Sequence, residues 1–403
     1  MCYTKFSGER MTENFKLLIL VYIAIQKLYF IEGNKKYMIT RKKTREVKVG
    51  SVIIGGENPI SVQSMLNVKH DNFAEMKTQI ALLKHAGCDI IRMAILNHDT
   101  IKTIGKLKEL MAVDKAYDIP IVADIHFNHK LAVECAYAGI DKIRINPGNI
   151  GDENNIKLVA DICGNKKIPI RIGVNGGSVE EHILKKYGSP SVDALVESAA
   201  YNIRLLEKFD FNDIVVSIKS SDISKTIEAN LNIADMFDYP LHIGITEAGT
   251  AHIGLIKNSI GIGSLLNMGI GDTIRVSLTA TPVLEVYEGI SILKALGLYK
   301  KSIDIISCPT CGRCKTDIIG ISNEVEKRLS ILEKRMDGEK KRNIKVAVMG
   351  CAVNGPGEAR EADVGIAGGN REFLLFRNGE AVTKIPASKA VDILIKEVED
   401  LIF

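Results

Sequence analysis

Eight short apolar segments, each followed by a stretch with helical periodicity, dominate the sequence after residue 50. Such runs are typical of buried parallel strands, and the amphipathic stretches between them predict helices that cover the sheet. The repeat is about thirty residues long, which is the length of one strand and one helix. Eight such units predict an α/β chain that folds as a (β/α)8 TIM barrel. The expected strands are Ile60–Met65, Asp89–Leu96, Ile119–Phe127, Lys142–Pro147, Ile168–Asn175, Ile214–Ser221, Leu241–Glu247 and Thr273–Thr279.

A doubly wound open sheet is the alternative to the barrel, because it has the same alternation of strands and helices. It is disfavoured because no GxGxxG motif follows an early strand. One interval between strands is longer than the rest and contains YGSPSVDALVESAAYNIRLLEKF. There Ser191 is expected to cap an amphipathic helix.

Each expected strand ends in a polar or charged side chain, although buried parallel strands are normally apolar. The C-terminal ends of barrel strands meet at one mouth, so these side chains are expected to converge there. One arginine at a strand end is more often a surface residue, but eight polar ends in phase favour a site. The eight side chains are Gln63, Arg92, Asp124, Arg144, Arg171, Lys219, His242 and Arg275.

Five of these side chains are cations, and their chemistry points to an anionic ligand. Arginine forks bind phosphate oxygens in pairs, and the glycines of NPGNIG and GVNGGS let backbone N–H groups approach an anion. Asn146, Asn149 and Asn175 add neutral donors. The pattern therefore predicts a substrate with more than one phosphate group.

Candidate acid–base groups lie in the same segments. VADIHF contains Asp124 and His126, and LHIGITEAG contains His242 and Glu247. The alternative for both carboxylates is simple pairing with the neighbouring arginines.

The overall charge excludes binding by a general electrostatic field. Lysine and arginine total 53 residues against 49 acidic residues, a net charge of +4, and tryptophan is absent. Such a chain has no field that would hold nucleic acid or an anionic membrane, so an anion site must be local.

Eight cysteines in 403 residues are too few for a secreted disulfide framework and favour a reducing, cytoplasmic compartment. Cys308, Cys311 and Cys314 lie in SCPTCGRC, and Cys351 begins CAVNGPGEA. Two cysteines separated by two residues can hold a metal or a cluster that a distant cysteine completes. A structural zinc knuckle or free thiols remain alternatives, whereas the lack of a CxxxCxxC motif disfavours a radical adenosylmethionine enzyme.

The chain is expected to have three parts. Residues 1–37 read as an N-terminal extension or a mis-assigned start, because Phe15–Ile31 is too short and too interrupted to cross a membrane. Residues 38–300 are expected to form the barrel. Residues 301–403 are expected to form a small α+β domain, with strands in IKVAVMG, ADVGIAG and EFLLFRNG and a final helix in SKAVDILIKEVEDLIF.

Several motifs together resemble the bacterial 4-hydroxy-3-methylbut-2-enyl diphosphate synthase family of the non-mevalonate isoprenoid pathway. They are VQSM, VADIHF, IRINPGNIG, IPIRIGVNGGS, LHIGITEAG, IGDTIRVSL, SCPTC and GCAVNGPGEA. The resemblance runs from about residue 38 to the C-terminus, with the motifs in family order. It implies reductive, ring-opening dehydration of 2-C-methyl-D-erythritol 2,4-cyclodiphosphate with two electrons, flavodoxin or ferredoxin as electron donor, and a homodimer.

The resemblance also implies roles for individual residues. A [4Fe–4S] cluster would be held by Cys308, Cys311, Cys351 and Glu358, and Glu247 would act as the acid–base group. The residues expected to hold the diphosphate or line the site are Arg92, Arg144, Arg171, Lys219, Asn175 and His242. Cys314 departs from the family pattern and offers a possible fourth thiolate.

Two other functions compete with this interpretation. One is a dihydropteroate-synthase-like or methyltransferase barrel with a structural zinc knuckle, and the other is a redox sensor that holds a cluster without catalysis.

Overall fold

The computed structural model describes residues 39–146, 149–299, 303–314, 316–336, 343–351, 357 and 359–403. The chain divides into two units, residues 1–40 and 41–403, and only the last two residues of the first unit are described. The expectation for residues 1–37 therefore lies outside the described residues, as does Glu358.

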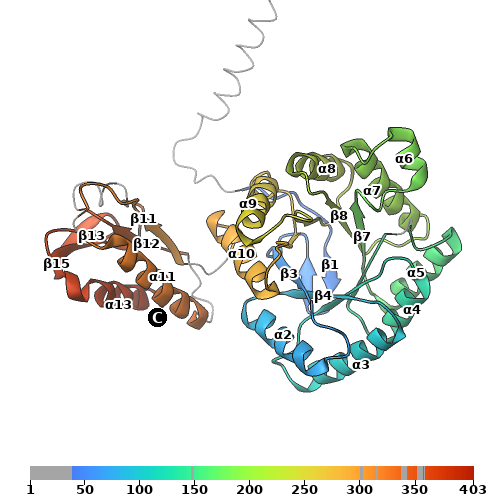
Figure 1. Ribbon diagram of the computed structural model, residues 1–403, viewed down its shortest axis with the longest axis horizontal. Coiled ribbons are helices and arrows are strands. Elements are labelled where there is room, and N and C mark those ends of the chain that lie inside the picture. Colours follow the sequence, from blue (N-terminus) through green and yellow to red (C-terminus); the bar gives the residue numbers. More distant parts are fainter. Residues whose placement is uncertain are drawn as a thin grey trace, which may run out of the picture. The chain divides into compact units, whose positions relative to one another are not determined.

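The predicted barrel is confirmed (Figure 1). Eight parallel strands pair in the order β8-β7-β6-β5-β4-β3-β10-β9, and a bridge between Val216 and Leu241 joins the two ends of that order. The strands are β3 (Ser61–Met65), β4 (Ile90–Ala94), β5 (Ile121–Asp124), β6 (Lys142–Ile145), β7 (Ile170–Asn175), β8 (Ile214–Lys219), β9 (His242–Ile243) and β10 (Thr273–Ile274).

Helices surround the barrel and bury their apolar faces against the outward side chains of the strands. They are α2 (Phe73–His85), α3 (His98–Val113), α4 (His129–Tyr137), α5 (Glu153–Lys166), α6 (Glu181–Tyr187), α7 (Val192–Glu207), α8 (Ile223–Met236), α9 (Ala251–Asn267) and α10 (Pro282–Ala295). Ser191 caps α7 as expected, since its hydroxyl accepts a hydrogen bond from the Ala194 N–H at 3.2 Å. Among the described residues, none of the helices has the length and apolar character that a membrane crossing requires.

An antiparallel hairpin of β1 (Val47–Val49) and β2 (Val52–Ile54) contributes the apolar side chains Val47, Val49 and Ile54 to the core. They cluster with Ile90, Val122 and Val215, which lie inside the barrel. This hairpin therefore closes the N-terminal end of the barrel.

The last two barrel strands are shorter than expected. Gly244, directly after β9, lies so close to Arg275 that an added Cβ would be 2.3 Å from the Arg275 carbonyl oxygen. The backbone beyond β9 and β10 leaves the regular ladder there, although the Arg275 N–H still donates to the Ile243 carbonyl at 3.1 Å.

Strand register sets the height of each inward side chain. Parallel strands in a closed eight-stranded barrel are staggered, so inward residues from alternate strands form layers of four. The registers place Ile90, Lys142, Val215 and Thr273 in a lower layer, Gln63, Val122, Arg171 and His242 in a middle layer, and Arg92, Arg144, Ser217 and Arg275 in an upper layer.

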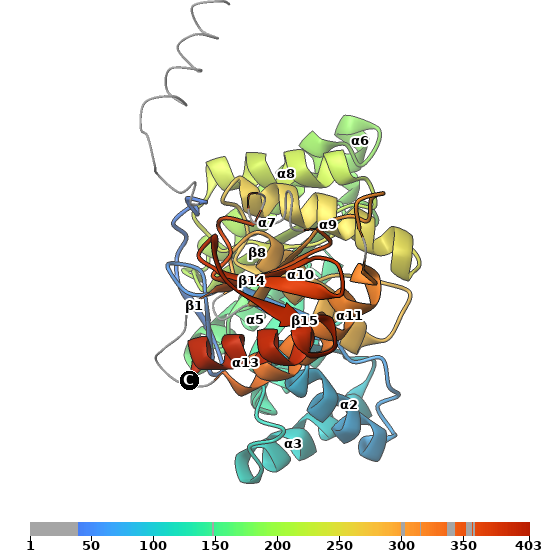
Figure 2. The same ribbon diagram turned by 90° about the vertical axis from the view of Figure 1, so that its left-hand side faces the viewer.

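The C-terminal residues form a separate five-stranded mixed sheet in the order β11-β12-β13-β14-β15, which confirms the predicted α+β domain. Its strands are β11 (Ile303–Ser307), β12 (Ile344–Met349), β13 (Val364–Gly368), β14 (Glu372–Arg377) and β15 (Glu380–Pro386). The helices α11 (Ile318–Arg335) and α13 (Ala390–Ile402) pack against each other and against this sheet, with the short helix η2 (Ala387–Lys389) preceding α13 (Figure 2).

Replacing the N-cap residue of α7 tests how much its hydrogen bond stabilises this helix. Ser191→Ala removes the acceptor for the Ala194 N–H and should lower the free energy of unfolding by about 1 kcal/mol. Thermal or urea unfolding measures this loss. Thr250→Ala is the matched control, because Thr250 caps α9 without a side-chain hydrogen bond. Equal stability losses in the two variants would contradict the capping role.

Candidate active site

A cavity of about 320 Å³ opens at the C-terminal end of the barrel strands. Every strand of the barrel, or the segment directly after it, contributes to the lining. The polar lining residues are Arg92, Asp124, His126, Arg144, Arg171, Asn175, Ser217, Lys219, Thr246, Arg275 and Ser277. The structure therefore brings together five of the predicted substrate-binding residues, namely Arg92, Arg144, Arg171, Asn175 and Lys219.

Asp124 is the buried anion that orients two of these arginines. Its Oδ1 accepts a hydrogen bond from Arg144 Nη1 at 3.1 Å, and its Oδ2 lies 3.7 Å from Arg92 Nε. Burial raises the pKa of Asp124, but nearby His126 and the charges of three neighbouring arginines outweigh burial and hold that pKa well below its usual range. Asp124 is therefore ionised and pairs with two arginines, and its acid–base role stays a prediction.

Gly173 makes room for the Arg144 side chain. An added Cβ at Gly173 would lie 2.3 Å from Arg144 Nε, and the Gly173 carbonyl accepts a hydrogen bond from Arg144 Nη2 at 3.1 Å. Because both Nη atoms of Arg144 donate to fixed acceptors, the orientation of its guanidinium group in the cavity is fixed.

Arg171 and Lys219 have no carboxylate partner among the described side chains. Arg171 is buried, and its Nε and Nη1 atoms have no hydrogen-bond partner in the described part of the chain. Lys219 Nζ lies 3.2 Å from His242 Nε2. Burial and the surrounding cations lower the pKa of both groups. A bound anion would supply the charge that these side chains lack.

Arg275 is the fifth basic side chain of the lining, and one further carboxylate among the described residues lies beside it. Its Nη2 is 3.4 Å from Oε2 of Glu285, which also accepts a hydrogen bond from the Leu278 N–H at 2.9 Å. Among the described residues, five basic side chains thus line the cavity and two buried carboxylates lie beside them, which favours an anionic ligand.

His242 lies below the cavity rather than in its lining. It occupies the middle layer, is fully buried, and its Nδ1 atom has no partner among the described residues. Burial and the neighbouring Lys219 hold the pKa of His242 well below its usual range. His242 is therefore neutral at neutral pH and contacts the site through Lys219.

Glu247 lies on the loop after β9, exposed and outside the cavity lining. Its φ angle of 53° is in the left-handed region, which glutamate rarely adopts. Such a backbone conformation is typical of functional loops. The neighbouring Thr246 does line the cavity.

Sequence reasoning missed several lining residues. Met65 accepts a hydrogen bond from Arg92 Nη2 at 2.9 Å, and Ser217 and Ser277 share the lining. The signal was present, because Ser217 lies two residues before Lys219 and Ser277 two residues after Arg275. Alternate residues of a strand face the same side.

Two cysteines follow neighbouring strands of the C-terminal sheet. Cys308 follows β11 and Cys351 follows β12, and these strands are parallel neighbours. The Gly350 N–H donates to Cys308 Sγ at 3.0 Å. An added Cβ at Gly350 would lie 2.9 Å from Cys314 Sγ and 3.3 Å from Cys308 Sγ, so this glycine leaves room for both sulfur atoms.

These thiols fit a soft-metal or iron–sulfur group in their chemistry. The four described cysteines of the C-terminal domain are free thiols. Within the described part of the chain, no three histidine, cysteine or acidic side chains stand close enough to hold a metal ion as they are. The proposed fourth ligand, Glu358, lies outside that part.

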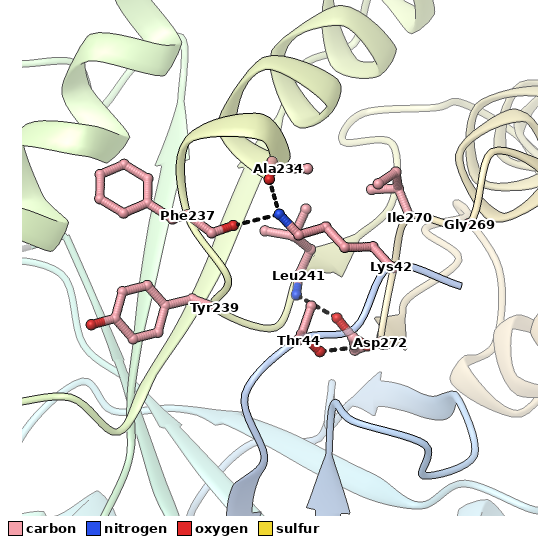
Figure 3. Close-up of a pocket in the computed structure, with 10 residues that line it drawn as sticks. Lys42, Thr44, Ala234, Phe237, Tyr239, Leu241, Gly269, Ile270 and Asp272 are labelled. Carbon is pink, nitrogen blue, oxygen red and sulfur yellow. Dashed lines mark hydrogen bonds between the residues drawn. The ribbon is translucent and has the colours of Figure 1, made fainter. Parts of the chain in front are cut away.

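A second hollow lies beside β9 and β10, between residues that lead into the barrel and the end of α8 (Figure 3). Lys42 donates to the Phe237 carbonyl at 2.9 Å and to the Ala234 carbonyl. Asp272 accepts hydrogen bonds from Thr44 Oγ1 at 3.1 Å and the Leu241 N–H at 2.9 Å. Because these polar groups pair with one another at the N-terminal end of the strands, this hollow has a structural role.

Comparison with known proteins covers both domains. Residues 44–290 match the GcpE TIM-barrel domain, and residues 304–400 match the GcpE protein C-terminal domain. The 4-hydroxy-3-methylbut-2-en-1-yl diphosphate synthase (flavodoxin) of Ruminiclostridium cellulolyticum is 50% identical over 363 residues, covering 90% of this chain and 99% of that protein. The protein of the same name from Caldanaerobacter subterraneus is 52% identical over 362 residues, covering 90% and 98%.

Among solved structures, the dihydropteroate synthase of Xanthomonas albilineans aligns with a TM-score of 0.44 and 11% identity, covering 62% of this chain and 97% of that one. The two family matches, by contrast, together span the barrel and the C-terminal sheet, and the curated relatives share about half of their residues with this chain over nearly their full length. The chain belongs to the GcpE family.

Proposed function

We propose that this protein is a 4-hydroxy-3-methylbut-2-enyl diphosphate synthase. The reaction opens the ring of 2-C-methyl-D-erythritol 2,4-cyclodiphosphate, consumes two electrons and two protons, and releases one water molecule. The observation that carries this proposal is the ring of five cations around one cavity, in a chain about half identical to enzymes of that name. Membership of this family argues against the dihydropteroate-synthase-like barrel and the non-catalytic redox sensor.

The cavity is the proposed diphosphate site. Arg144 and Arg92 are oriented by Asp124, so their outer N–H groups are fixed before the substrate arrives. Arg171 and Lys219 lack anionic partners among the described residues, so phosphate oxygens would satisfy them. Binding of a dianion therefore replaces repulsion between the cations by attraction.

Other side chains complete the proposed site. Asn175 lines the cavity, and its Oδ1 accepts a hydrogen bond from the Gly177 N–H at 3.1 Å, which fixes the loop after β7. His242 orients Lys219 from below. Arg275, which lines the cavity as its place at a strand end predicts, is a further phosphate ligand in this proposal.

The cysteines of the C-terminal domain form the proposed redox site. Cys308, Cys311 and Cys351, with Glu358, would hold a [4Fe–4S] cluster. When bound, such a cluster supplies electrons one at a time. Its carboxylate ligand would bind iron more weakly than a thiolate ligand does. The N–H donated by Gly350 to Cys308 Sγ would stabilise the thiolate.

Glu247 is the proposed acid–base residue. Its carboxyl group would hold the proton that the leaving oxygen needs when the ring C–O bond breaks. Its left-handed backbone and its place beside Thr246, a lining residue, support this role.

The electron donor and the assembly are part of the proposal. The curated relatives are flavodoxin enzymes by name, so flavodoxin is the expected donor, with ferredoxin as the alternative. The cavity and the thiols belong to different domains, and a homodimer would let the C-terminal domain of one protomer serve the barrel of its partner. Free thiols and an oxygen-sensitive cluster suit the reducing cytoplasm.

One experiment tests the whole proposal. The protein is reconstituted anaerobically, its iron and sulfide are counted, and turnover of the cyclic diphosphate is followed with a chemical reductant. Iron and sulfide in a ratio near one, together with turnover, are expected. Zinc without sulfide would favour the zinc-knuckle alternative, and a cluster without turnover would favour a redox sensor.

Arg144→Met should weaken substrate binding and leave the iron content unchanged. Losing a charge-assisted phosphate contact costs roughly 1.5–3 kcal/mol, or roughly tenfold to over a hundredfold in affinity. Titration of the cyclic diphosphate against the oxidised protein measures the change. Arg204→Met, on the exposed face of α7, is the control and should bind normally. An unchanged affinity in Arg144→Met would remove Arg144 from the site.

A pair of substitutions tests the fourth cluster ligand. Cys314→Ser should keep both cluster and activity, whereas Glu358→Gln should retain much of the iron but lose most turnover. The reason is that four thiolate ligands would leave no iron of the cluster free to bind substrate. A carboxylate ligand binds its iron more weakly and can be displaced from it. Iron analysis, electron paramagnetic resonance and turnover are the measurements. The opposite pattern, with Cys314→Ser losing the cluster and Glu358→Gln fully active, would make Cys314 the ligand.

A further inference from the structure

Lys142 is buried at the centre of the barrel, below the cavity. It begins β6 and lies in the lower layer with Ile90, Val215 and Thr273. Its side chain is fully buried, and its Nζ atom has no hydrogen-bond partner among the described residues. Lys142 does not line the cavity, so the proposed diphosphate site leaves this lysine without a role.

The described surroundings of Lys142 are mostly apolar and include no carboxylate that pairs with it. The β1–β2 hairpin below it presents the apolar Val47, Val49 and Ile54, and β3 presents the uncharged Gln63. Asp124 is already paired with Arg144 and Arg92 in the layers above. The charged or titratable groups inside the barrel are Arg92 on β4, Asp124 on β5, Arg144 on β6, Arg171 on β7, Lys219 on β8, His242 on β9, and Arg275 after β10 with its partner Glu285 on α10.

An ammonium group in this place is unfavourable while the cavity is empty. A buried charge without a partner loses its hydration and gains nothing in return. Burial, followed by the charge of Arg171, holds the pKa of Lys142 well below its usual range. In the free protein, burial without a hydrogen-bond partner among the described residues therefore favours the neutral amine at Lys142 over the ammonium form. A neutral amine can also accept a hydrogen bond, and the Arg171 N–H groups at Nε and Nη1 lack acceptors among the described residues.

An anion in the cavity changes this balance. Phosphate groups bound by Arg144, Arg92 and Arg171 would cancel the positive charges that repel a proton from the barrel centre. They would lie in the cavity, above the layers of inward side chains that cover Lys142, and the protein interior between them screens charges only weakly.

We propose that Lys142 is a positioning residue that takes up a proton when the cyclic diphosphate binds, so that the occupied barrel gains a cation beneath the phosphates. This inference rests on the proposed function, because it needs a dianionic ligand in the cavity. Its consequence is that substrate binding tightens as the pH falls, because the bound state holds one more proton than the free state.

Calorimetry measures the proton directly. The cyclic diphosphate is titrated into the oxidised holoenzyme, without reductant, at neutral pH in two buffers of different ionisation enthalpy. The difference in heat gives the number of protons taken up on binding. Wild-type protein should take up about one proton more than Lys142→Met, in which an unbranched apolar chain of similar length replaces the amine.

Lys108→Met is the matched control. Lys108 Nζ lies 2.8 Å from Asp141 Oδ2 on the outer side of the barrel, away from the cavity. This variant should take up as many protons as the wild type. Equal proton uptake by wild type and Lys142→Met would overturn the proposal while leaving the proposed function intact. A wild-type protein that does not bind the cyclic diphosphate would overturn both.

Thermal unfolding of the ligand-free protein provides a second readout. Lys142 is neutral when folded and protonated when unfolded below its unfolded pKa of about 10.4, so it lowers stability at neutral pH. Lys142→Met should therefore melt at a higher temperature than wild type at neutral pH, and the gap should shrink as the pH approaches 10.4. A Lys142→Met midpoint below that of wild type would overturn the neutral state. Lys142→Gln repeats both measurements if the methionine variant does not fold.

Discussion

The structure depends on the burial of more positive than negative charge inside a closed barrel. TIM barrels usually fill their centre with branched apolar side chains, but here Gln63, Arg171 and His242 take three of the four places in the middle layer. Among the described residues, Asp124 and Glu285 are the carboxylates that pair with basic side chains of the lining. The apolar contacts between strands and helices hold these like-charged side chains close together, and the proposed dianionic substrate would offset the repulsion between them.

Backbone positions without a side chain make this crowding possible. Gly173 leaves the space that the Arg144 guanidinium occupies, and an added Cβ at Gly244 would lie 2.8 Å from Lys219 Nζ as well as against Arg275. Gly350 does the same for the sulfur atoms of Cys308 and Cys314. In both domains a glycine therefore sets how closely the functional groups approach, and a methyl group at any of these positions would displace a functional side chain.

The sequence predicted the order of strands and helices because each unit carries its own hydrophobic period, and it predicted Arg92, Arg144 and Arg171 because charges inside buried strands are rare. It could not predict which layer along the barrel axis each inward side chain would occupy. Gln63 and His242 were expected at the mouth, yet they lie in the middle layer, because the stagger of a closed barrel is a property of all eight strands together. The role of Lys142 was missed for the same reason, since its burial depends on the hairpin below it.

The proposed redox chemistry gives the basic side chains of the cavity a second role besides binding phosphate. A cluster held by three thiolates and a carboxylate is itself an anion, and electrons must reach a substrate that is also an anion. Two anions approach each other only where fixed positive charge offsets their repulsion. Arg171 and Lys219 have no carboxylate partner among the described residues, and with a proton taken up at Lys142 they would supply that charge from inside the barrel. The basic side chains and the thiols lie in two different domains. One domain offers N–H donors for phosphate, and the other offers soft sulfur ligands for iron.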